Sequence, residues 1–142
     1  MSKDNPYNDD RLRRIFPNWY TILYAVVCGF LIPWTILLAY ILPPHYVSHH
    51  WDIAWVGFDA FEVILFAITS YLAFTRSTWT ALTSAMLGTT LLTDAWFDVL
   101  TSRTAHAFTT SIIQAVFEVT FAVLSYILAF RVFNYVRKKS IH

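Results

Sequence analysis

Four apolar stretches make up most of this chain, each near the ~20 residues that cross ~30 Å of hydrocarbon. They span residues 18–42, 51–74, 78–101 and 105–130. The composition agrees, because 57% of the residues are hydrophobic and only 13% are charged, which is too apolar for an ordinary soluble domain. We therefore expect one all-α domain over residues 1–142, a polytopic membrane protein folded as a four-transmembrane-helix bundle.

The basic residues are segregated along the chain. Nine of the ten Lys and Arg residues precede the first stretch, lie between the second and third, or follow the fourth. Only Arg103 lies on the other side. The positive-inside rule then predicts a multi-pass protein of the plasma membrane with both termini in the cytoplasm.

Two cofactor classes are excluded by the residues available. Cys28 is the one cysteine, so neither an internal disulfide nor a CxxC redox pair can form. No lysine lies between Lys3 and Lys138, which excludes a retinal Schiff base inside the bundle. Nothing in the sequence indicates nucleic-acid binding.

The second and fourth stretches resemble each other. Residues 61–76 and 117–131 share, in the same order, the motif Phe-Glu-Val, a Ser-Tyr pair, an Ala-Phe pair and a closing arginine. The similarity predicts a duplicated two-helix hairpin, whose halves are related by an axis along the membrane normal. Glu62 and Glu118 then lie at equal depth near the bilayer centre.

Five carboxylates fall inside the apolar stretches, where no lysine or arginine accompanies them. An ionised acid at membrane depth costs several kcal/mol, on the order of 3 or more, so such residues usually face a bundle interior or a water-filled cavity. They are the first candidates for a functional site, and they are Asp59, Glu62, Asp94, Asp98 and Glu118.

Helical spacing places these acids on facing stripes. Trp55, Asp59 and Glu62 follow one another by four and three residues and therefore share one helix face. Asp94 and Asp98 share a face of the next helix, and Gln114 and Glu118 share a face of the last. In lipid, the favourable arrangement turns polar stripes toward one another.

The depths of the acids predict an acidic funnel open to the outside and closed toward the cytoplasm. Five like charges this close cannot all be ionised, so protons or a bound cation complete the balance. We expect a pocket that binds a proton, a metal ion or a small organic cation, either for transport or for binding alone. Trp55 and Trp96 are candidate aromatic faces for an organic cation, and Gln114 a candidate polar ligand.

A second candidate constellation lies at the predicted outer rim. His49, His50 and Asp52 flank the start of the second stretch and His106 lies at the start of the fourth, with His45 nearby. Imidazole and carboxylate groups suit zinc and other transition metals. The alternative is that these are interfacial histidines of a hydrated loop. The basic segment after residue 130 determines orientation and can also contact anionic lipid.

The segments His50–Asp59 (HWDIAWVGFD) and Thr93–Asp98 (TDAWFD) resemble those of uncharacterised small four-helix membrane proteins of Gram-positive bacteria. The resemblance covers the second and third stretches best and implies a plasma-membrane location and a four-helix arrangement, without an activity. The bundle is also similar in architecture to the EXPERA group of sterol-isomerase-like proteins, which place acids in a cavity open to one side.

Two other functions remain open at this point. One is a membrane-embedded enzyme that acts on a lipid or isoprenoid by acid–base chemistry, for which two carboxyl groups of unequal environment are suited. The other is an accessory membrane protein whose polar stripes only specify packing. The expected partners are the bilayer, a small cation or lipidic ligand, and a second copy in a homodimer.

Overall fold

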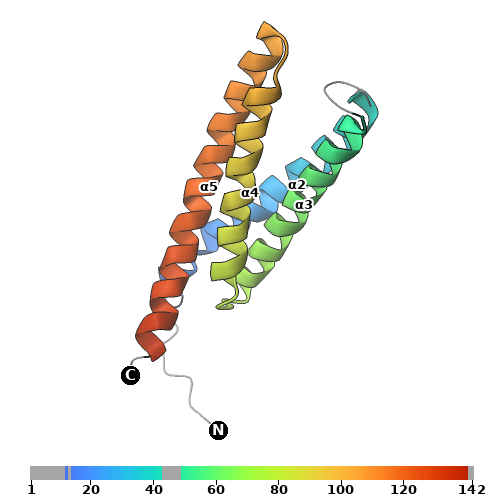
Figure 1. Ribbon diagram of the computed structural model, residues 1–142. Coiled ribbons are helices and arrows are strands. Elements are labelled where there is room, and N and C mark those ends of the chain that lie inside the picture. The colour runs from blue at the N-terminus through green and yellow to red at the C-terminus, as the bar shows by residue number, and fades with distance from the viewer. Residues whose placement is uncertain (1–11, 13, 43–48, 141–142) are drawn as a thin grey trace.

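The computed structural model describes residues 12, 14–42 and 49–140 of the chain. This part contains four long helices and is all-helical, which confirms the all-α, four-helix part of the predicted fold class (Figure 1). The helices are α2 (Asn18–Ile41), α3 (Trp51–Phe74), α4 (Thr80–Thr101) and α5 (Ala105–Ser140).

Most helix boundaries agree with the apolar stretches, and two differ. Helix α4 begins at Thr80 rather than at residue 78, because the residues before it form a turn in which Arg76 has a left-handed φ of 54°. Helix α5 continues to Ser140 rather than ending at residue 130. No Gly or Pro follows Phe130 to end it, and basic residues near a helix C-terminus interact favourably with the helix dipole.

Three of the described helices, α2, α3 and α5, are long and apolar enough to cross a membrane. Helix α4 does not reach the same apolarity, because it carries six threonines and two aspartates. Of the four predicted membrane spans, three are therefore supported by length and composition. Many large apolar side chains, such as Phe30, Tyr40 and Phe117, are exposed on the surface of the helices, which suits contact with lipid.

The helices pack as two antiparallel hairpins, α2–α3 and α4–α5. Helix α3 also contacts α4, but less extensively than each helix contacts its own hairpin partner. We call the end with the start of α2, the α3–α4 turn and the end of α5 the terminal end, and the opposite end the loop end. The hairpins lie together near the terminal end and diverge toward the loop end (Figure 1).

The densest packing lies in the half of the molecule nearer the terminal end. We call this region the inner core; among its fully or almost fully buried side chains are Phe16, Tyr20, Tyr24, Phe66, Leu87, Leu128 and Val132. Gly88 lets α4 approach α5 closely there, since an added Cβ would lie 3.1 Å from the Ala122 carbonyl oxygen. The inner core closes the bundle at one end and leaves the diverging half for the acids.

Candidate functional site

Helices α3, α4 and α5 each place acids on the face that turns toward the other helices. Glu62 is only 4% exposed and Asp94 only 7% exposed. Asp59, Asp98 and Glu118 are half-buried. The predicted polar stripes therefore face inward, as helical periodicity requires.

The five acids form one cluster, which we call the acid cluster. Glu62 lies within electrostatic range of Glu118, Asp59 and Asp98. Asp94 lies within electrostatic range of Glu62, Glu118, Asp98 and Asp59. Asp59 and Glu118 each lie within range of Asp98 and of one another. The structure thus brings together every acid that the sequence singled out.

Two hydrogen bonds fix how α4 and α5 align. The hydroxyls of Ser102 and Ser111 are 2.8 Å apart, and those of Thr89 and Tyr126 are 2.9 Å apart. Counting along the antiparallel helices from these bonds places Asp94 opposite residues 119–121, within one helical turn of Glu118. By the same count Asp98 lies within one turn of Gln114, whose amide is half-buried.

An aromatic layer separates the acid cluster from the rest of the inner core. The Phe66 and Phe121 rings meet edge to face with centroids 6.0 Å apart, and Tyr24 meets Phe66 at 5.6 Å. Phe66 lies one turn after Glu62, and Phe121 lies three residues after Glu118. We call these three rings the aromatic floor. The sequence analysis missed them, although the spacing of Phe66 from Glu62 and of Phe121 from Glu118 places each of these two rings on the same helix face as the glutamate.

The carboxyl groups of the cluster are incompletely satisfied. Within the described residues, one buried oxygen on each of Asp59, Glu62, Asp94 and Glu118 has no hydrogen-bond partner. A buried polar atom without a partner costs roughly 1–3 kcal/mol, and more when it is charged. The cluster is therefore suited to accept protons, a cation or a hydrogen-bond donor.

The two predicted tryptophans lie in different surroundings. Trp55 is half-buried and packs against Trp51 and Phe58, with ring centroids 5.3 and 6.4 Å away. Trp96 is 65% exposed. It follows Asp94 by two residues, which turns it by roughly 200° around the helix and away from the cluster. The predicted contact of Trp96 with a ligand is therefore not supported by its position and stays a prediction.

The rim histidines do not assemble into a metal centre in the described part of the chain. His49 and His50 lie next to each other with ring centroids 4.6 Å apart, and His106 is exposed. No group of three or more His, Cys, Asp or Glu side chains among the described residues is placed to hold a metal ion, with Asp52 included. His45 lies outside the described residues.

Two grooves run along the helix pairs. One of about 450 Å³ lies between α3 and α4 and is lined by Phe58, Phe61, Ala85, Met86, Thr89, Thr90 and Thr93. The other, about 360 Å³, lies between α2 and α3 beside Cys28 and Ser70. Phe61 and Thr93 of the first groove's lining precede Glu62 and Asp94 in the sequence, but neither of these two acids lines the groove itself.

Comparison with family models, curated proteins and solved structures gives no match to this chain. The resemblance to small four-helix proteins of Gram-positive bacteria therefore stays a prediction.

Proposed function

We propose that this protein is an integral membrane protein that binds a cation at the acid cluster. The observation that carries the proposal is that five acids lie within electrostatic range of one another, with unpartnered oxygens on the most buried of them. Residues 15–75, 77–102 and 104–130 contain no Lys or Arg to neutralise them. Protons or an external cation must then supply the missing positive charge.

The contacts between helices argue against a purely structural role for the acids. Helices α2 and α5 are joined by the Tyr24–Ser125 hydroxyl pair at 2.9 Å. The hydroxyl pairs Thr89–Tyr126 and Ser102–Ser111 join α4 to α5. Polar packing in this bundle thus uses hydroxyl groups, while the acids keep oxygens without partners. An accessory protein with polar packing stripes has no need of them.

The surroundings favour a proton or a small organic cation over a metal ion. The aromatic floor offers rings next to Glu62 and Glu118, and such rings attract cations by their negative faces. The hairpins diverge toward the loop end in Figure 1, and the buried side chains of the inner core lie nearer the terminal end, so we propose that a cation enters from the loop end. Access from one side only would be one state of a transporter, so transport is part of the proposal.

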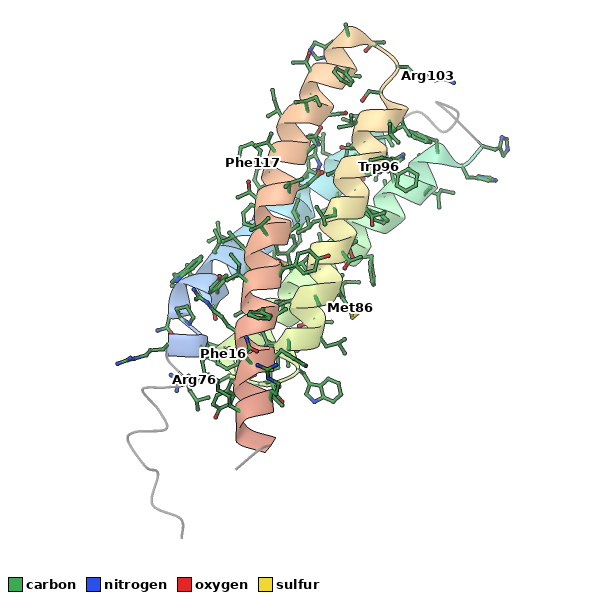
Figure 2. The ribbon with its side chains drawn as sticks, turned by 60° about the vertical axis from the view of Figure 1, so that its left-hand side comes forward. Phe16, Arg76, Met86, Trp96, Arg103 and Phe117 are labelled. Carbon is green, nitrogen blue, oxygen red and sulfur yellow. The ribbon has the colours of Figure 1, made fainter. Side chains whose placement is uncertain are left out.

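The orientation of the proposal follows from charge. Arg76 and Arg103 lie at opposite ends of the molecule (Figure 2). Arg14, Arg131, Arg137 and Lys138 belong to the end of Arg76. We place the terminal end in the cytoplasm and the loop end outside the plasma membrane.

We also propose that the two hairpins arose by duplication of one ancestral hairpin. The α2–α3 and α4–α5 pairs each form a close antiparallel hairpin, and the glutamates of their second helices, Glu62 and Glu118, interact in the centre. A homodimer is compatible with the size of the chain.

The direct test is thermal unfolding of the purified protein in detergent with a panel of monovalent, divalent and organic cations. A cation at 100 times its Kd should stabilise the protein by about 2.7 kcal/mol. Glu62→Gln and Glu118→Gln should abolish this stabilisation, and Asp52→Asn, which removes an acid of α3 outside the cluster, should not. Two outcomes contradict the proposal. In one, cations stabilise the wild type and all variants equally. In the other, no cation stabilises any of these proteins, the wild type included, at any pH.

The groove between α3 and α4 favours one second candidate, a membrane-embedded enzyme that moves a proton on a lipid or isoprenoid. It is lined by aromatic rings and threonines, among them Phe61 and Thr93, which neighbour Glu62 and Asp94 in the sequence, so a lipid chain held there would lie next to the helix turns that carry these acids. Incubation with membrane lipids in D₂O tests this function. Deuterium uptake into one lipid class, lost in Asp94→Asn, would favour the enzyme over the cation-binding protein.

A further inference from the structure

We propose that buried hydroxyl groups in the inner core, with internal water, conduct protons between the acid cluster and the terminal end. This inference rests on the proposed function, because it requires the acid cluster to take up protons. Apart from Tyr24 of the aromatic floor, it concerns different residues, in the half of the molecule that the sequence predicted to be closed toward the cytoplasm. The hydroxyls are those of Tyr24, Thr69, Ser84 and Ser125.

The first observation is how most threonines of this bundle use their hydroxyls. Thr89, Thr90 and Thr93 each donate to the carbonyl oxygen four residues earlier at 2.9 Å. The same backbone bond satisfies the exposed hydroxyl of Thr120 at 2.7 Å. A helical Ser or Thr can use this carbonyl wherever it stands, so a hydroxyl in lipid need never lack a partner.

Thr69 and Ser84 depart from this behaviour. Both side chains are fully buried, and neither hydroxyl oxygen has a hydrogen-bond partner within the described residues. Buried hydroxyls in native proteins are satisfied by protein or by internal water. Because Thr69 and Ser84 leave the available carbonyl unused, we infer that each binds internal water.

The positions of the hydroxyls suit a route through the inner core. Thr69 lies five residues before the end of α3, and Ser84 lies four residues after the start of α4. Both are therefore roughly 7 Å along their helices from the α3–α4 turn. Ser125 follows Glu118 by seven residues, as Thr69 follows Glu62, and its hydrogen-bond partner Tyr24 is part of the aromatic floor. Thr80, fully buried at the terminal end, donates to the Ser77 carbonyl in the turn.

The surrounding side chains make this route selective. Leu87, Leu128 and Val132 are fully buried around it, and Phe66 is 1% exposed. Packing this tight excludes a hydrated ion, whereas a proton needs only a chain of hydroxyls and single water molecules. A proton leaves a protonated Glu62 or Glu118, passes by exchange of O–H bonds, and is released to water at the terminal end. No bond other than O–H forms or breaks, and no electron is transferred.

The test is proton flux into vesicles that contain the reconstituted protein and a pH-sensitive dye, driven by a potassium diffusion potential. Thr69→Val keeps the size of the side chain and removes the hydroxyl, and Ser84→Ala removes the other. Each should slow the flux roughly tenfold or more, as expected when one hydrogen-bonded link is lost. Thr120→Val is the matched control on the outer surface and should conduct like the wild type. Thr69→Ser, which restores a hydroxyl, should restore flux and so distinguish the effect from misfolding.

Cation-dependent thermal stabilisation, measured on the same preparations, separates this proposal from the proposed function. Thr69→Val should keep that stabilisation while losing flux. Wild-type flux equal to that of empty vesicles, or unchanged flux in Thr69→Val and Ser84→Ala, overturns the proton route and leaves the acid-cluster proposal to stand on the stabilisation. If no cation stabilises the wild type against thermal unfolding, the acid cluster is not a cation site.

Discussion

Among single residues, Glu62 and Asp94 contrast most strongly with the apolar bundle around them. They are almost completely buried, face three other acids and keep oxygens without partners. Helical periodicity was sufficient to predict their faces. The same periodicity, applied to Trp96, turns its side chain away from Asp94, whereas the prediction of Trp96 as a ligand residue relied on residue type alone.

Neutralising Glu62 should stabilise the protein. Glu62→Gln removes one of several repelling charges, so at pH 8 we expect a gain in unfolding free energy of roughly 1–3 kcal/mol over the wild type. At pH 5 the wild-type acids gain protons and lose their mutual repulsion, so the difference should shrink. Thermal unfolding at both pH values measures it. Asp52→Asn should do the opposite and lose ~0.3–1 kcal/mol, because Asp52 lies in the first turn of α3.

The hydrogen bond between Tyr24 and Ser125 should be measurable by a double-mutant cycle. Both side chains are fully buried, and their hydroxyl oxygens are 2.9 Å apart. Tyr24→Phe or Ser125→Ala alone leaves one hydroxyl without its partner and should cost roughly 1–3 kcal/mol of unfolding free energy. The double variant should cost less than the sum of the two. Strict additivity would show that the two hydroxyls do not interact.

At the scale of elements, the apolar stretches located the helices but not all of their ends. The start of α4 depends on the α3–α4 turn, where Ser77 donates its amide to the Leu72 carbonyl at 2.9 Å. The end of α5 depends on helix propensity and dipole, because residues 131–140 are no longer apolar enough to mark a membrane span. Hydropathy alone carried no information about either feature.

The two helix-interior glycines on α2 and α4 should respond oppositely to alanine. At Gly88 a Cβ would lie 3.1 Å from the Ala122 carbonyl oxygen and 3.2 Å from the Tyr126 ring. At Gly29 it would meet nothing within 4 Å. Gly29→Ala should therefore gain ~0.5–1 kcal/mol from helix propensity. Gly88→Ala should be less stable than Gly29→Ala by roughly 1–3 kcal/mol, because α4 and α5 must move apart. Equal melting temperatures would show that this approach does not depend on the glycine.

At the scale of the whole molecule, the sequence predicted which groups would converge but not the shape that holds them. The two hairpins are in contact where Tyr24, Phe66 and Phe121 meet, and such contacts between distant segments leave no local signal in the sequence. The sequence also could not predict that the hydroxyls of Thr69 and Ser84 lack hydrogen-bond partners within the described residues, because a buried threonine and a lipid-facing one look alike in sequence.

The orientation in the membrane can be checked with single cysteines. In a Cys28→Ala background, Arg103→Cys should react with a membrane-impermeant thiol reagent in intact cells. Arg137→Cys, on the exposed end of α5, should react only after the membrane is opened. The reverse pattern would invert the proposed topology and place the opening between the hairpins in the cytoplasm.

The composition of α4 has a consequence for biogenesis. A segment with six threonines and two aspartates gains little by leaving the insertion machinery for lipid alone. Helix α5 begins only a few residues later and packs closely along it. Helix α4 can bury its aspartates only against a neighbouring helix, so we expect α4 to stay in the insertion machinery until α5 emerges and the two helices enter the bilayer together. The polar residues of α4 would thereby set the order in which the helices enter the membrane.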